Sequence, residues 1–119
     1  MAQEEGFVNE NFEAILTIRL LNGSQLECAL DTGFNGFLLL PRKFIEDNSL
    51  PFVGSEFVIM VEENTTEVEV VSGEIIWLGE TLPVRILVSE TEETLIGTKM
   101  LIDSKLEIDY KNLTVKITK

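Results

Sequence analysis

Apolar and polar residues alternate along much of the chain, beginning near Phe12. The side that would face a core carries four apolar residues in succession, Ala14, Leu16, Ile18 and Leu20. A period of two predicts a half-buried β-strand. Asn22-Gly23 follows and is a strong signal for a tight hairpin turn. Residues 25–30 are therefore expected to return as a second strand that ends at Asp31.

The middle of the chain predicts a short strand, a helical segment and a long hairpin. Residues 37–40 are apolar and few enough for a buried strand. Pro41 suits the start of a helical segment over residues 42–48. Residues 56–72 alternate on both sides of a strongly polar tip, which predicts a hairpin.

The last part of the chain predicts two more hairpins with a short helix between them. Residues 74–78 and 82–88 flank a turn signal at Gly79-Glu80. Residues 98–104 are long enough for a short helix, and residues 106–117 alternate on both sides of a polar turn. The chain is therefore expected to close with a hairpin.

Together these elements amount to about eight or nine short strands, two helical turns and no long helix, which is typical of an all-β barrel or sandwich. The length of 119 residues fits one domain. We expect that domain to cover residues 12–119. Residues 1–11 are expected to form a polar N-terminal arm, with Phe7 and Val8 as its candidate anchors.

The chain is strongly acidic, with 21 Asp and Glu, 9 Lys and Arg, and a net charge of −12. Such a surface repels phosphate backbones and anionic membranes, so neither nucleic acid nor a membrane is expected as a partner. No apolar run reaches the roughly 20 residues that span a bilayer, and the N-terminus lacks a signal-peptide pattern. The single cysteine, Cys28, agrees with a reducing compartment, and a cytoplasmic location is expected.

The residue types that the sequence lacks exclude several kinds of catalytic and metal-binding site. The sequence has no histidine and one cysteine. It therefore lacks the groups for Ser-His-Asp or Cys-His catalysis, and for histidine or thiolate-cluster metal sites. Nucleotide-binding glycine motifs are absent as well. No metal or cofactor is expected, carboxylates remain for acid–base chemistry, and Cys28 is expected to be a small buried residue.

Asp31 is the carboxylate whose surroundings stand out. It follows an apolar strand, and a second apolar run begins at Phe37. Gly33 and Gly36 lie between the two runs, where they let the backbone turn sharply and bring its N–H groups close to the carboxylate. Asp-Thr-Gly is also ordinary turn chemistry, so this stretch alone does not decide the function.

Three features in this order resemble the retropepsin-like aspartic proteases, and more narrowly their small single-domain prokaryotic members. They are the Asp-Thr-Gly loop within residues 29–36, the polar-tipped hairpin of residues 56–72, and Leu95-Ile96-Gly97 before a short helix. The resemblance covers roughly residues 12–118. It implies a closed, barrel-like, all-β acid-protease fold with one or two short helices, equivalent to one half of a pepsin-type bilobe.

The resemblance also implies roles for individual residues. Asp31 would be the catalytic aspartate, Thr32 would join the hydrogen-bonded support of the active-site loops, and Gly33 would let substrate approach closely. Leu95, Ile96 and Gly97 would pack beside the Asp31 loop. The tip of a substrate-binding flap would consist of Glu62, Glu63, Asn64, Thr65 and Thr66.

Aspartic protease chemistry needs two carboxylates, one as base toward a water and one protonated. This chain has a single Asp-Thr-Gly, so the pair requires a two-fold homodimer. The expected function is that of an endopeptidase acting on peptide or unfolded protein. In the retroviral enzymes the termini pair across the dimer, but the arm at residues 1–10 and the hairpin at 105–118 differ enough that we do not transfer this feature.

The sequence departs from the family at two places, which keeps other functions open. Phe34 stands where pepsin-type enzymes carry a small hydroxyl residue, and the flap tip has no glycine pair. One alternative is a dimeric peptide-binding module of the same fold with weak or no catalysis, holding a strand by backbone pairing. The other is a structural β-domain in which Asp31 only stabilises a turn.

Overall fold

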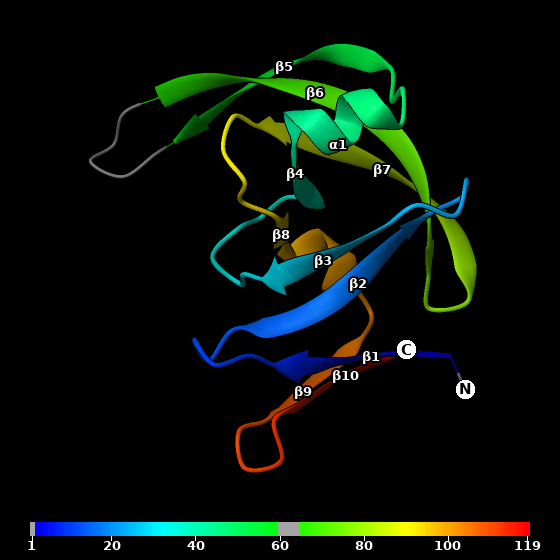
Figure 1. Ribbon diagram of the computed structural model, residues 1–119, viewed down its shortest axis with the longest axis vertical. Helices are drawn as coiled ribbons and strands as arrows, with labels where there is room; N and C mark the ends of the chain where they lie inside the picture. Colours follow the sequence, from blue (N-terminus) through cyan, green and yellow to red (C-terminus); the bar gives the residue numbers. More distant parts are fainter. Residues whose placement is uncertain (1, 60–64) are drawn as a thin grey trace.

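The computed structural model describes residues 2–59 and 65–119, which form strands of varied length with one short α-helix on the outside of the sheet (Figure 1). The elements in chain order are β1 (Gln3–Val8), β2 (Ala14–Leu20), β3 (Gln25–Leu30), β4 (Leu38–Pro41), α1 (Arg42–Asp47), β5 (Phe52–Ile59), β6 (Thr65–Trp77), β7 (Glu80–Ser89), β8 (Leu95–Ile96), the 3-10 helix η2 (Thr98–Leu101), β9 (Lys105–Asp109) and β10 (Thr114–Thr118).

All the described strands belong to one sheet, in the order β5-β6-β7-β4-β8-β3-β2-β1-β10-β9. A further pairing joins β6 to β2, with Arg19 opposite Ile76 and Leu20 opposite Ile75. The pairings from β2 through β3, β8, β4 and β7 to β6 therefore return to β2 and form a closed ring. The all-β class and the closed arrangement expected from the sequence are confirmed.

Most of the core comes from the inward-facing apolar sides of the ring strands, and Val8 of β1 and Val115 and Ile117 of β10 add to it from outside the ring. β2 follows the predicted period of two, and its four inward residues are each at most 5% exposed. The ring strands add fully buried side chains, Leu38, Leu40, Ile75, Ile86 and Ile96. Cys28 is also fully buried, as predicted.

Two parallel strand pairs distinguish this sheet from a simple series of hairpins. β3 pairs in parallel with β8, and β4 pairs in parallel with β7, while β8 lies between β3 and β4. The chain leaves β3 at Asp31 and enters β4 at Leu38, so the connecting loop lies directly beside the end of β8. The fold therefore brings the Asp31 and Gly97 segments together, although 66 positions of sequence separate them.

Most of the expected polar arm forms β1, a strand that the sequence did not predict. Glu5 is opposite Lys116 and Gly6 is opposite Val115 in an antiparallel pairing with β10, and Phe7 is opposite Ile15 of β2. The strand was missed because its residues are mostly polar, and only Val8 of β1 is buried. Its pairing is supplied by the backbone of its neighbours.

The helices are shorter than predicted. α1 ends at Asp47, and Pro41 caps its N-terminus instead of lying within its first turn. The segment after Gly97 forms a single 3-10 turn. Each difference affects one end of an element, where local sequence signals are weakest.

Gly6→Ala tests whether β1 is an integral part of the domain. A Cβ at Gly6 would collide with the backbone carbonyl oxygen of Ile15. We expect the free energy of unfolding, measured with urea, to fall by about 1–3 kcal/mol. Glu5→Ala in the same strand changes an exposed side chain and is expected to have an effect within about 0.5 kcal/mol. Equal small effects of the two substitutions would show that β1 contributes little to the domain.

Candidate active site

Asp31 lies at the exposed end of β3, with its backbone tied to β8. Its N–H donates to the carbonyl oxygen of Ile96 at 3.0 Å. Its carboxylate oxygen Oδ1 accepts from the backbone N–H of Gly33 at 2.8 Å. The loop therefore holds the carboxylate in a defined place while leaving it open to solvent.

The rest of the 31–37 loop is fastened to the segment that follows β8. The Gly97 N–H donates to the Phe37 carbonyl oxygen, and the Thr98 N–H donates to the Phe34 carbonyl oxygen, each at 2.9 Å. Backbone hydrogen bonds thus hold the loop at its start, middle and end. The arrangement needs no particular side chain other than that of Asp31.

Two glycines make this close approach sterically possible. A Cβ on Gly97 would collide with the Gly36 carbonyl oxygen, and a Cβ on Gly36 would lie 2.7 Å from the Phe34 ring. The ring therefore occupies space that Gly36 and Gly97 leave free. Phe34 is half-buried by this packing, so its departure from the family pattern is accommodated within the loop.

The other predicted loop residues occupy different environments. Leu95 and Ile96 form β8 opposite Ala29 and Leu30, and Ile96 is fully buried. Thr32 is exposed, and its hydroxyl has no hydrogen bond to residues 2–59 or 65–119 of the chain. The single chain therefore brings Asp31, Ile96 and Gly97 together and leaves the Thr32 hydroxyl free of the described residues.

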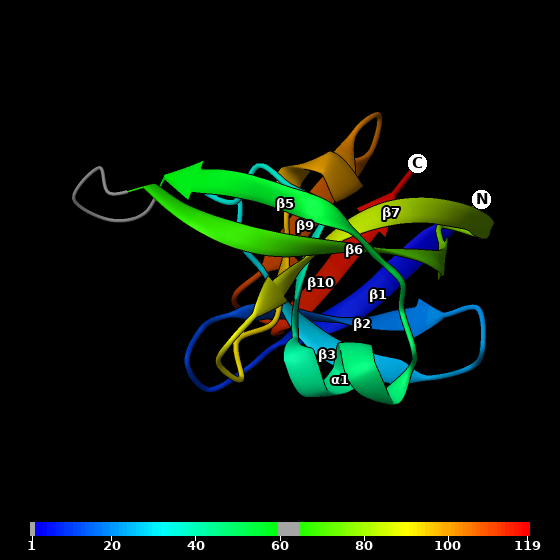
Figure 2. The same ribbon diagram turned by 90° about the horizontal axis from the view of Figure 1, so that it is seen from above.

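The predicted flap corresponds to the β5–β6 hairpin, which projects from the body of the molecule (Figure 2). Thr65 is opposite Ile59 and Thr66 is opposite Val58, and both threonines are exposed. The predicted tip residues Glu62, Glu63 and Asn64 lie outside the described residues. β6 continues from this hairpin into the ring, where it pairs with β7 and β2.

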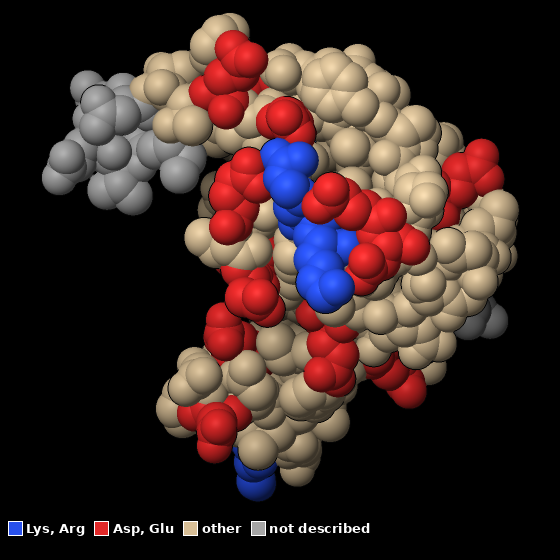
Figure 3. All heavy atoms as spheres, turned by 45° about the horizontal axis from the view of Figure 1, so that its top comes forward, with Lys and Arg blue, Asp and Glu red and all other residues tan. Residues whose placement is uncertain are grey.

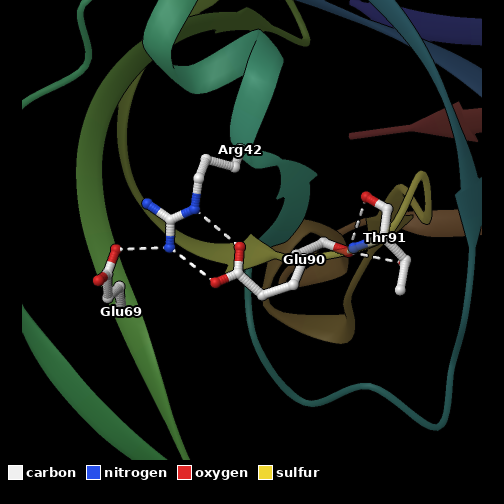
Figure 4. A network of polar contacts seen from close by, with 5 residues as sticks. Arg42, Glu69, Glu90 and Thr91 are labelled. Atoms are coloured by element: carbon white, nitrogen blue, oxygen red, sulfur yellow. Dashed lines mark hydrogen bonds and ion pairs between the residues drawn. The ribbon is translucent and has the colours of Figure 1, made fainter.

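An ion-pair network that the sequence analysis missed joins the flap to the body (Figure 4). Arg42 of α1 donates from Nε and Nη2 to the two carboxylate oxygens of Glu90, at 2.7 and 2.8 Å. Its Nη2 also donates to Oε2 of Glu69 on β6, at 2.8 Å. Three segments that are distant in sequence therefore meet at one guanidinium group. Its contact with Glu90 is bidentate, because two N–H groups bind the two carboxylate oxygens. We call this network the Arg42 clamp.

The clamp shifts the ionisation of its members toward their charged forms. The hydrogen bonds that Arg42 donates lower the pKa of Glu90 below its ordinary value of 4.5, and the acceptance of these bonds by Glu90 and Glu69 raises the pKa of Arg42. Because the folded state favours ionised Glu90, the resulting stabilisation is complete above pH 4.5. This stabilisation is lost as the pH falls through the lowered pKa of Glu90 in the folded protein.

The charge pattern around the site is dominated by carboxylates. On the face in Figure 3, acidic side chains are widely spread, while most of the visible Lys and Arg atoms lie in a central group and a separate basic group lies at the lower edge. Within the described chain, no three His, Cys, Asp or Glu side chains come together in a way that could hold a metal ion. Burial raises the pKa of the Cys28 thiol to about 12, so this thiol is not a reactive nucleophile.

Two hollows in the surface of the single chain are both lined by Phe37, at the end of the 31–37 loop, and neither is lined by Asp31. One, of about 520 Å³, lies at the root of the flap and includes Leu50, Pro51, Gly73 and Pro83. The other, of about 260 Å³, includes Trp77, Leu82 and Met100.

The described part of the chain contains no helix that is long and apolar enough to cross a membrane.

Comparison with solved structures identifies the fold. A retropepsin-like aspartic protease from Rickettsia conorii superimposes with a TM-score of 0.69 at 14% identity, over 97% of this chain and 89% of that protein. The foamy viral protease–reverse transcriptase, solved with an RNA/DNA hybrid, gives a TM-score of 0.58 at 17% identity, over 80% of this chain and 13% of that longer chain. No protein-family model and no curated protein matches the sequence. The chain has the retropepsin-like aspartic protease fold, which confirms the fold expected from its motifs.

Gly97→Ala tests the contact between the loop and β8. The added methyl group would meet the Gly36 carbonyl oxygen and the Phe34 ring. We expect the free energy of unfolding to fall by at least about 2 kcal/mol, with faster amide hydrogen exchange in residues 31–37. Thr98→Ala keeps the backbone N–H that bonds to Phe34 and is the matched control. A loss no larger than that of the control would contradict the packing described here.

Arg42→Gln tests the clamp. At pH 6 we expect little change in the midpoint of thermal unfolding, because the ion pairs are exposed. Amide exchange in β5 and the outer part of β6 is expected to become faster, since the flap loses its link to α1. The difference between wild type and variant should shrink below pH 4.5 as Glu90 is protonated.

Lys43→Gln is the control for this experiment, because Lys43 is also on α1 but pairs with Asp47 in the same helix. Equal exchange rates in the flap of wild type and Arg42→Gln at pH 6 would show that the clamp does not restrain the hairpin.

Proposed function

We propose that the protein is an aspartic endopeptidase that acts as a homodimer on peptides or unfolded protein. The observation that carries this proposal is the placement of Asp31. Its carboxylate is exposed at a strand end and accepts from the Gly33 N–H, while its backbone N–H donates to the Ile96 carbonyl oxygen of β8. The retropepsin-like fold and the projecting β5–β6 hairpin support the same function.

The proposed chemistry uses Asp31 from each of two copies. One carboxylate takes a proton from a water molecule, which attacks the carbonyl carbon of the peptide bond. The other carboxyl group is protonated and donates a hydrogen bond to the carbonyl oxygen. The C–N bond of the resulting tetrahedral intermediate then breaks as the carboxyl group that took the water's proton passes it to the leaving nitrogen, which releases an acid and an amine. Two adjacent carboxylates do not readily ionise together, so cleavage is expected to be faster in mild acid than at neutral pH.

The remaining predicted residues have roles in this proposal that depend on the second copy and on substrate. The Thr32 hydroxyl is exposed and is therefore available to support the loop of the partner. Gly33 leaves room for a substrate backbone next to Asp31. The flap residues Glu62, Glu63, Asn64, Thr65 and Thr66 would cover an extended peptide, which strands bind through backbone hydrogen bonds.

A second candidate function is a dimeric peptide-binding module with little or no catalysis. Phe34 favours it, because a phenyl ring cannot donate a hydrogen bond to the outer carboxylate oxygen as the family's hydroxyl residue would. In this case the groove would still hold a peptide strand. The two functions differ in whether the Asp31 pair carries out chemistry.

Asp31→Asn separates the two functions. If the protein is a protease, cleavage of an unfolded casein-like substrate between pH 3 and 7 is expected to fall by about 10²–10⁴-fold or more, because an amide cannot act as the base. Asp103→Asn changes another exposed aspartate, one with positive φ that asparagine tolerates. It is expected to keep full activity.

Peptide binding without cleavage by the wild type would instead support the binding module. Loss of cleavage with unchanged unfolding free energy and unchanged dimerisation would place the effect of Asp31→Asn in the chemistry. Equal cleavage by wild type and Asp31→Asn would overturn the protease proposal.

A further inference from the structure

We propose that the second copy of the chain docks on a surface formed by two turns beside the Asp31 loop, and that the dimer forms without exchange of terminal strands. We call this surface the turn patch and define it by Phe12 in the 9–13 turn and by Tyr110 and Leu113 in the 110–113 turn. The inference rests on the proposed function, because it names the partner contact that would complete the Asp31 site.

The strand register places both turns at the same end of the sheet as Asp31. Ile15 is opposite Ala29, so the 9–13 turn before β2 lies beside the exit of β3 toward Asp31. The Val8 N–H donates to the Leu113 carbonyl oxygen at 3.0 Å, so the 110–113 turn lies beside the 9–13 turn. Figures 1 and 2 show the two turns and the 31–37 loop on the side of the molecule toward which the flap projects.

The turn patch exposes large apolar side chains. Phe12 is 70% exposed, Tyr110 is 57% exposed and Leu113 is 46% exposed. The 110–113 turn is held in place by Asp109, whose Oδ1 accepts from the N–H groups of Lys111 and Asn112 at 2.9 and 3.0 Å. The patch is therefore presented on a turn with a defined conformation.

Phe12 and Leu113 also have an unfavourable backbone conformation. Their φ angles are 62° and 58°, in the left-handed region that glycine and asparagine favour. Each position thus combines backbone strain with an exposed apolar side chain, and both features cost free energy in an isolated chain. Burial of these side chains by a partner would offset that cost.

The terminal strands are already paired within the chain. β1 lies between β2 and β10, and β10 lies between β1 and β9, so both are interior strands of the sheet. Among the described strands only β5 and β9 have an unpaired edge. A dimer in which β1 or β10 crosses to the partner would first have to break these pairings.

The turn patch would supply part of the area that a homodimer centred on Asp31 needs. At their exposures, Phe12 and Tyr110 each offer roughly 100–150 Å² of surface. A stable interface buries about 800 Å² per partner, so surface beside the patch, including the neighbouring Asp31 loop, would have to contribute the remainder. A two-fold axis beside Asp31 would bring the turn patch of each copy to the same interface.

The net charge gives this interface a distinctive salt dependence. Two copies that each carry −12 repel one another, while apolar contact is not weakened by salt. Dimerisation is therefore expected to strengthen as salt is added, because screening removes the repulsion.

The test is the double variant Phe12→Asn/Leu113→Asn, compared with wild type by sedimentation equilibrium and urea unfolding. Asparagine tolerates the left-handed conformation, so the monomer is expected to keep its fold. The dimer dissociation constant is expected to rise at least about tenfold. Leu21→Asn is the control, because Leu21 is 53% exposed in the turn at the opposite end of β2 and should leave dimerisation unchanged.

Activity assays separate this inference from the proposed function. If both hold, cleavage by the double variant is reduced at low protein concentration and recovers at high concentration. If the wild type dimerises without cleaving and the double variant does not dimerise, the turn patch stands and the protease proposal fails. A double variant that dimerises as tightly as wild type overturns the turn patch, and so does a wild type that remains monomeric at all concentrations.

Discussion

The close contact between the Asp31 loop and the end of β8 is the constraint on which the candidate site depends. Neither segment can hold its position alone, because each uses the other's backbone for its hydrogen bonds. The contact requires that Gly97 have no side chain. It also requires the parallel pairing of β3 with β8, which joins two strands that are far apart in the sequence. The position of the carboxylate is therefore a property of the whole fold.

The sequence was sufficient to predict the parts of the fold whose signals are local. The period of two predicted β2, and the strong turn signal after it predicted that β3 returns beside β2 and ends at Asp31. The pairing of Asp31 with the Leu95-Ile96-Gly97 segment came from a family resemblance, because no local rule links positions so far apart. The structure shows why these two segments can lie together: Gly97 has no side chain, so its backbone approaches the Gly36 carbonyl oxygen closely.

The features that could not be predicted are those whose causes lie in neighbouring strands. β1 has no apolar period, and its strand conformation comes from hydrogen bonds offered by β10 and β2. The Arg42 clamp joins a helix, a flap strand and a loop whose separations in sequence match no recurring motif. The fit of the Phe34 ring against Gly36 and Gly97 likewise depends on a contact between separate segments.

The continuity of β6 has a mechanical consequence for the flap. Thr65–Trp77 is one unbroken strand whose outer part belongs to the projecting hairpin and whose inner part is fixed in the ring by β7 and β2. The hairpin therefore extends from the ring without an intervening loop on the β6 side. The fully buried Ile75 lies in the inner part of β6, so the direction in which the β5–β6 hairpin leaves the ring depends on packing in the core.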